Sequence, residues 1–206
     1  MFKNRLNAGH TLAEKLISYR GIGVLVLGLA RGGVVVGRTV AQDLSLPFDV
    51  LVVKKISSPA NEEFALGALA PDGVSFINWK LVERSGIDQQ TIQIWLENLS
   101  RVIQEKMLLY RKGKKPLIVR DKTVIIVDDG MATGAPLQVA IKWCRAKKAR
   151  KIIAAVPVAN PKAVGKITPE VDACVVVETP EQFEAVGQWY KEFPQITDQN
   201  VIKYLT

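Results

Sequence analysis

The stretch Val124-Ile125-Ile126-Val127-Asp128-Asp129-Gly130-Met131-Ala132-Thr133-Gly134-Ala135-Pro136 decides the fold of this 206-residue chain. Its first four residues are β-branched and apolar, which predicts a strand buried on both faces, as in a parallel sheet. The apolar periodicity from Leu137 onward predicts a helix, with Thr133 able to cap it and Pro136 in its first turn. A strand, a polar loop and a helix N-terminus together form a site for an anion, because loop N–H groups and the helix dipole point at the same space.

Two adjacent carboxylates, Asp128 and Asp129, stand in this loop and would repel a phosphate directly. We therefore expect them to face sugar hydroxyls, or a divalent cation that bridges to phosphate oxygens. A ligand with a phosphate and a vicinal diol, such as a ribose 5-phosphate, satisfies the whole loop. An acidic pair can also simply solvate a turn, and response-regulator receivers carry one after their first strand, but this pair lies beyond the middle of the chain. The joint pattern favours the sugar phosphate.

A second strand–loop–helix unit lies nearer the N-terminus. Residues 24–27 predict a strand, and the loop Gly28-Leu29-Ala30-Arg31-Gly32-Gly33 leads into a predicted helix over residues 34–44. The loop is not a P-loop, because no Gly-Lys-Ser/Thr follows, and its glycine spacing does not match a dinucleotide fingerprint. A plain tight turn with an exposed arginine is one interpretation, and a second phosphate-binding loop is the other.

Both motifs resemble those of the type I phosphoribosyltransferases. Residues 124–136 are similar to the family's phosphoribosyl pyrophosphate (PRPP) motif, which is an apolar strand, an acidic pair and a Thr-Gly turn. Residues 30–33 are similar to the Ser-Arg-Gly-Gly pyrophosphate loop of xanthine-guanine enzymes. The resemblance covers residues 21–177 as architecture. It implies an α/β fold with a mostly parallel, doubly wound sheet flanked by helices and a small variable hood.

The resemblance implies that the ribose 5-phosphate of PRPP is transferred to a nitrogen acceptor, a nucleobase or related heterocycle, with release of pyrophosphate. Asp128 and Asp129 would hold the ribose hydroxyls, and Mg²⁺ would bind mainly through the substrate, with these two carboxylates as possible ligands. Lys54 and Lys55, after a predicted strand over residues 49–53, are candidates for the departing charge, although lone lysine pairs are usually just solvated. The predicted catalytic residues are Asp128, Asp129, Lys54 and Lys55. The predicted PRPP-binding residues are Ala30, Arg31, Gly32, Gly33, Asp128, Asp129, Gly130, Met131, Ala132, Thr133, Gly134 and Ala135.

Two positions depart from the family pattern. Ala132 stands where hypoxanthine-guanine and xanthine-guanine enzymes carry an aspartate that contacts the purine ring, so a 6-oxopurine acceptor is disfavoured. Pro136 stands where the family commonly has a second Thr or Ser that donates to the 5′-phosphate. Proline lacks both that hydroxyl and an N–H, and each lost charge-assisted bond weakens binding by roughly 1.5–3 kcal/mol.

We expect one domain over residues 1–206, with its core at 21–177 and the hood formed by the N-terminal helix and residues 178–206. The other elements expected are a helix over 6–19 capped by Asn7, a polar loop over 56–63 that resembles in position the family's closing loop, a hairpin over 64–77, a helix over 88–111, strands over 152–156 and 173–177, and a helix over 161–167. By analogy, Phe183, Trp189 and Tyr190 are candidates for the acceptor pocket. Aromatic residues that merely pin the tail to the core are an equal alternative.

The composition is that of an ordinary soluble globular protein, with 48% hydrophobic and 23% charged residues. The net charge of +8 suits an anionic ligand, but it suits nucleic acid equally. An alternative function is therefore a non-catalytic module that senses PRPP or nucleotides. Such a module would bind nucleic acid through the basic runs at 111–115 and 145–151.

Cysteine usage and the N-terminal sequence bear on the compartment. Cys144 and Cys174 have neither CxxC spacing nor clustered histidines, which indicates reduced, buried thiols. The first residues lack the apolar core of a signal peptide, and no run approaches a transmembrane span. We therefore expect a cytoplasmic protein without a membrane partner. The resemblance adds PRPP, a small-molecule acceptor and a homodimeric state.

Overall fold

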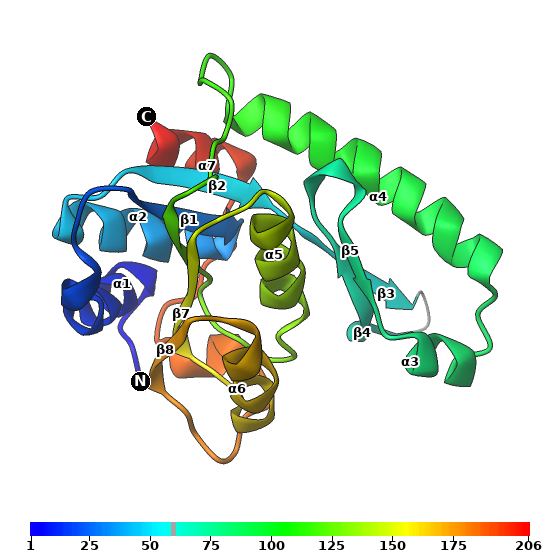
Figure 1. Ribbon diagram of the computed structural model, residues 1–206. Coiled ribbons are helices and arrows are strands. Elements are labelled where there is room, and N and C mark those ends of the chain that lie inside the picture. The colour runs from blue at the N-terminus through cyan, green and yellow to red at the C-terminus, as the bar shows by residue number, and fades with distance from the viewer. Residues whose placement is uncertain (59–60) are drawn as a thin grey trace.

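The computed structural model describes residues 1–58 and 61–206 and is built around a five-stranded sheet in the order β2-β1-β6-β7-β8 (Figure 1). Its strands are β1 (Val24–Ala30), β2 (Phe48–Val52), β6 (Thr123–Val127), β7 (Lys151–Val158) and β8 (Ala173–Glu178). Every neighbouring pair is parallel. The predicted parallel sheet is therefore confirmed, and the strands that precede the two predicted loops, β1 and β6, are neighbours.

Helices cover both faces of this sheet (Figure 1). The helices α1 (Arg5–Lys15) and α2 (Gly32–Leu44) pack on one face, and α5 (Ala135–Ala146) and α6 (Pro161–Ile167) pack on the other. Side chains of β6 alternate between these two layers, because successive residues of a strand point to opposite faces. Ile125 joins the core under α1 and α2, and Ile126 joins the core under α5. Burial on both faces explains the apolar run of residues 124–127.

A second, antiparallel sheet of order β3-β4-β5 stands beside the first (Figure 1). It consists of β3 (Lys54–Ser58), β4 (Asn61–Leu69) and β5 (Ser75–Ile77), and it is followed by α3 (Trp79–Arg84) and α4 (Gln89–Tyr110). The predicted hairpin is confirmed, with a 3₁₀ turn at Pro71–Gly73. The last helix, α7 (Asp198–Leu205), packs with α4 and β2 around a small core of its own. Further 3₁₀ turns lie at Ile17–Tyr19, Thr168–Glu170 and Val186–Trp189.

Three local predictions need correction. The first helix begins at Arg5 and is capped by Asn4 rather than Asn7, because the Asn4 side chain accepts from the Asn7 N–H at 3.0 Å. The predicted loop over 56–63 falls largely on β3 and β4, with residues 59–60 outside the described part of the chain. The cap of α5 is Gly134 rather than Thr133, because the chain enters this helix at a φ of 82°, which a glycine adopts without strain.

The cysteine environments differ from each other. Cys144 is buried in α5, and burial raises the pKa of its thiol to about 12, so this thiol is inert. Cys174 is only half-buried, contrary to the prediction. Among the described residues, no helix is both long enough and apolar enough to cross a membrane.

Candidate active site

The loops after β1 and β6 meet at the carboxyl edge of the sheet, where α2 begins against the acidic pair. A Cβ on Gly32 would lie 1.8 Å from Asp129 Oδ2, and one on Gly33 would lie 2.6 Å from the carbonyl oxygen of Val127. The paired glycines are therefore required by the packing of one loop on the other. The peptide bond between Ala30 and Arg31 in the first loop is cis.

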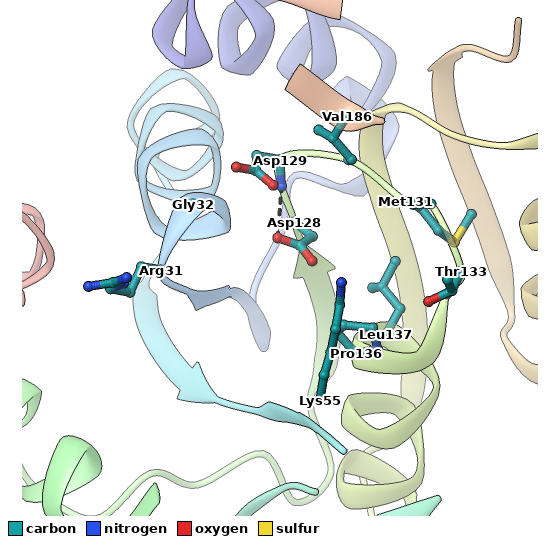
Figure 2. A pocket seen from close by; sticks show the side chains of 13 residues that line it. Arg31, Gly32, Lys55, Asp128, Asp129, Met131, Thr133, Pro136, Leu137 and Val186 are labelled. Carbon is teal, nitrogen blue, oxygen red and sulfur yellow. Dashed lines mark hydrogen bonds between the residues drawn. The ribbon is translucent and has the colours of Figure 1, made fainter. Parts of the chain in front are cut away.

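The two loops enclose a cavity of about 230 Å³, shown in Figure 2. We call it the acid-pair pocket; its lining residues are Arg31, Gly32, Lys55, Asp128, Asp129, Gly130, Met131, Ala132, Thr133, Gly134, Pro136, Leu137 and Val186. Most of the predicted PRPP-binding residues thus lie around one space. Ala30 ends β1, Gly33 lies in the first turn of α2 and Ala135 begins α5, and none of the three lines the pocket.

The second loop is tied to the neighbouring strand by backbone hydrogen bonds. The Met131 N–H donates to the Val158 carbonyl at 2.9 Å, and the Asn160 N–H donates to the Met131 carbonyl at 2.8 Å. Pro136 lies in the first turn of α5, as predicted, and lines the pocket with Leu137. One wall of the pocket is consequently apolar, and the opposite wall carries the acidic pair.

Asp129 is held by a residue that the sequence did not single out. Arg5 donates from Nε to Asp129 Oδ2 at 2.8 Å and from Nη1 to the Pro194 carbonyl at 2.8 Å, and its guanidinium lies 3.7 Å from the centroid of the Phe193 ring. The side chains of Arg5 and Asp129 are only 8% and 15% exposed. Since the pair spans 124 residues of sequence, no local pattern could reveal it.

The predicted acceptor aromatics are not among the residues that line the acid-pair pocket. The Tyr190 hydroxyl donates to the Asp129 carbonyl at 2.5 Å, and burial raises the pKa of this hydroxyl well above its ordinary value, so it remains a donor. Phe183 and Trp189 pack on the same buried cluster as Tyr190. Of the residues in this buried cluster, Val186 is the one that lines the acid-pair pocket. Whether the three aromatics contact an acceptor stays a prediction.

The environment of Asp128 disfavours the charged form of its carboxyl group. Its Oδ1 accepts from the Asp129 N–H at 2.9 Å. Burial, and then the neighbouring Asp129 carboxylate, raise the pKa of Asp128 well above the ordinary range, while Lys55 acts in the opposite direction. Figure 2 shows the Lys55 ammonium directed toward Asp128. Groups with shifted pKa values cluster at functional sites, which makes this pair a candidate for ligand contact.

The side chains of Lys54 and Lys55 line different cavities, and the catalytic role of either lysine stays a prediction. They begin β3, and successive strand residues point to opposite faces. Lys55 lines the acid-pair pocket, whereas Lys54 lines a neighbouring cavity. The Arg31 side chain also points away from Asp128 (Figure 2).

Comparisons with known proteins show which family the chain belongs to. The model of the phosphoribosyl transferase domain matches residues 2–191. The chain belongs to this family. It is 37% identical over 205 residues to a provisionally assigned phosphoribosyl transferase of Mycobacterium tuberculosis, a match that covers 100% of this chain and 46% of that protein. The chain thus spans about half the length of these curated relatives.

Solved structures show the same phosphoribosyltransferase fold. The crystal structure of TT1426 from Thermus thermophilus has a TM-score of 0.82 and 34% identity, and the match covers 99% of this chain and 97% of that one. A purine phosphoribosyltransferase from Pyrococcus horikoshii has a TM-score of 0.51 and 20% identity, covering 95% and 99%. The second likeness shows the fold alone. The predicted family and fold are confirmed.

Replacing Gly32 by alanine should destabilise this phosphoribosyltransferase domain. The new Cβ overlaps the Asp129 carboxylate, which cannot move without breaking its bond to Arg5. We expect a loss of about 1–3 kcal/mol, measured by urea unfolding. Gly165→Ala is the matched control, because its Cβ meets nothing within 4 Å and the residue lies in α6. Equal stabilities of the two variants would contradict the packing role of Gly32.

Replacing Arg5 by methionine should destabilise the protein by about 3–5 kcal/mol, because it leaves a largely buried carboxylate without its partner. The same change at the exposed Lys3 should have little effect. In a double-mutant cycle, Arg5→Met combined with Asp129→Asn should cost less than the sum of the single changes. Additive effects would show that the ion pair does not contribute.

Asp128→Asn should stabilise the free protein at neutral pH. Because the folded-state pKa of Asp128 is raised, the folded protein binds this proton more tightly than the unfolded chain. Stability therefore falls as the pH rises from the ordinary aspartate pKa through the raised one. This part of the pH dependence should be absent in the variant. Chemical unfolding of both proteins between about pH 4 and 8 measures it, and parallel curves would contradict the assignment.

Proposed function

We propose that this protein transfers the ribose 5-phosphate of PRPP to a nitrogen acceptor, a nucleobase or related heterocycle, and releases pyrophosphate. One observation carries the proposal: the acidic pair, the glycine-rich loop and the loop before α5 line a single pocket of about 230 Å³. Membership of the phosphoribosyl transferase domain family supports the class of reaction. The acceptor and the catalytic residues are part of the proposal.

In the proposed complex, the carboxylates of Asp128 and Asp129 accept hydrogen bonds from the ribose hydroxyls. Backbone N–H groups of residues 130–134 surround the 5′-phosphate, and residues 30–33 take the pyrophosphate with help from Lys55. The acceptor nitrogen supplies an electron pair to C1 of the ribose, and the bond from C1 to the pyrophosphate oxygen breaks. The protein contributes by positioning the reactants and by stabilising the charge that develops on the leaving group.

The residues present suit a Mg²⁺ ion bound mainly through the substrate. Within residues 1–58 and 61–206, no group of three or more His, Cys, Asp or Glu side chains is arranged to hold a metal alone. Asp128 and Asp129 nevertheless offer two carboxylates in the pocket. Mg²⁺ commonly keeps several waters and binds one or two carboxylates plus substrate phosphates. When bound, it would neutralise charge on the pyrophosphate.

The segment after β8 supports the proposal of a hood over the pocket. Val186 closes over the loop at Gly130, where an added Cβ would lie 2.4 Å from Val186 Cγ1. Ala132 lines the same pocket without a carboxylate, so a 6-oxopurine acceptor remains disfavoured. A single domain over residues 1–206, a homodimer and a cytoplasmic location complete the proposal.

The alternative, a regulatory module that binds nucleic acid, rests on the charge of +8. Four cations of its basic runs are engaged within the protein. Arg111 forms a two-bond ion pair with Asp49, and Lys147 pairs with Asp72. Arg145 donates to the Glu170 carbonyl, and Arg150 donates to the Thr123 hydroxyl. This internal pairing weakens the alternative. Nucleic-acid binding with a steep salt dependence would restore it.

Thermal unfolding with PRPP and Mg²⁺ tests the donor site. At a ligand concentration about a hundredfold above Kd, we expect a stabilisation of roughly 2.7 kcal/mol, or about 5–11 °C for a chain of this length. Asp128→Asn should lose most of the shift without disturbing the Arg5–Asp129 pair. Glu105→Gln, an exposed change on α4, is the control. A shift would justify screening acceptor bases for pyrophosphate release, whereas no shift at millimolar PRPP would refute the proposal.

A further inference from the structure

Two segments that are far apart in sequence meet beside the acidic pair. The Phe2 N–H donates to the Trp189 carbonyl at 2.8 Å, and the Lys191 N–H donates to the Phe2 carbonyl at 2.9 Å. These bonds belong to a short parallel pairing of the two segments. We call residues 2–5 and 189–194 together the clasp. Its two arms lie outside the motif that forms the acidic loop, so only the folded chain brings them to it.

The clasp holds both the backbone and the side chain of Asp129. The Tyr190 hydroxyl donates to the Asp129 carbonyl, and Arg5 donates from Nε to Asp129 Oδ2 at 2.8 Å. Arg5 also donates from Nη1 to the Pro194 carbonyl at 2.8 Å. One planar cation therefore joins a carboxylate of the acid-pair pocket to the segment after β8.

The Phe193 ring fixes the plane of this cation. The guanidinium carbon of Arg5 lies 3.7 Å from the centroid of the ring. The ring is held in turn by Tyr190, whose ring centroid is 4.9 Å away, and by Gly187, where an added Cβ would approach Phe193 Cδ1 to 3.1 Å. A guanidinium stacks on aromatic faces and donates in a rigid fork. Arg5 is thus preorganised to hold Asp129.

This arrangement has two consequences for a ligand of the acid-pair pocket. Arg5 offsets the charge of one of the two carboxylates, which lowers their repulsion of a phosphate-bearing ligand. It also restrains the Asp129 carboxylate beside a second cavity of about 330 Å³, which is lined by Arg5, Arg31, Gly32 and residues 193–196. Without the guanidinium, this space would allow the carboxylate to turn away from the acid-pair pocket.

We propose that Arg5 is a positioning residue of the acid-pair pocket, which orients the Asp129 carboxylate toward the ribose hydroxyls and offsets its charge against the phosphates of the ligand. The inference rests on the proposed function, because it takes PRPP as the ligand. Arg5 is not among the residues that line the acid-pair pocket, so it acts through Asp129. Because coupling is reciprocal, a ligand held by Asp129 also orders the clasp.

Calorimetric titration of PRPP with Mg²⁺, below the unfolding transition of each variant, tests the proposal. Arg5→Met should weaken PRPP binding about tenfold or more, because both the orientation and the charge compensation are lost. Arg5→Lys restores the charge without the two-bond fork, so it should recover part of the affinity. Ile103→Ala, at a buried position of α4, destabilises the protein by a cavity and should keep the wild-type affinity.

Phe193→Leu is a milder variant that keeps both partners of the ion pair, and it carries the test if Arg5→Met does not fold. Phe193 is partly exposed, so the change should cost little stability. Loss of the stacked ring should weaken PRPP binding about two- to fivefold. Phe76→Leu is the matched control, because Lys142 lies over that ring at 5.1 Å from its centroid, and it should leave PRPP binding unchanged.

Hydrogen exchange measures the coupling in the other direction. The N–H groups of Lys191 and Glu192 donate to the carbonyls of Phe2 and Lys3, so their exchange reports opening of the clasp. In wild-type protein, PRPP with Mg²⁺ should slow their exchange. In Arg5→Met the slowing should be absent even at saturating PRPP, an effect that a loss of global stability alone would not produce.

Three results would overturn the proposal: wild-type affinity for PRPP in Arg5→Met, equal losses of affinity in Arg5→Met and Ile103→Ala, or no recovery of affinity in Arg5→Lys. The failure of the proposed function is a different result. If wild-type protein does not bind PRPP at millimolar concentration, the proposed function is refuted, and this inference falls with it. If wild-type protein binds PRPP and the binding is insensitive to Arg5, only this inference fails.

Discussion

The contact between the first turn of α2 and the acidic loop after β6 is the constraint on which the pocket depends. β1 and β6 are parallel neighbours, so their loops leave the same edge of the sheet side by side. The loops can then approach only where side chains are missing, and Gly32 and Gly33 provide that space against Asp129 and the Val127 carbonyl. The glycine pair therefore shapes the pocket before any ligand binds. A glycine-rich loop can serve protein packing and ligand approach at the same time.

Asp129 occupies this narrow space because parts of the chain far from the motif hold it there. Arg5 pairs with its carboxylate, and Tyr190 donates to its carbonyl. Arg5 is itself fixed by the Pro194 carbonyl and the Phe193 ring. A largely buried ion pair contributes little net stability, yet the loss of one partner is costly. The position of the Asp129 carboxylate thus depends on α1 and on the segment after β8. Neither segment belongs to the motif at residues 124–136.

The charged side chains around the pocket lower the folding stability of the ligand-free protein. Asp128 carries a raised pKa, chiefly because of burial and the carboxylate beside it, and Lys54 carries a lowered one because of burial and its cationic neighbours. Each shift means that the folded protein disfavours the charged form of the group. A ligand with hydroxyl donors beside Asp128 would favour the charged carboxylate and so offset that penalty.

The sequence by itself determined the elements and loops whose causes are local. Residues 124–127 predicted a buried strand, and residues 88–111 predicted a long helix. Both predictions rest on the spacing of apolar residues, which can be seen in a short stretch of sequence. The tertiary structure alone decided the partners and faces of individual side chains. Lys54 and Lys55 are alike in sequence, but β3 begins at Lys54, so strand alternation directs them to different cavities. Arg5 reaches Asp129 across 124 residues, and such a pairing exists only once the chain has folded.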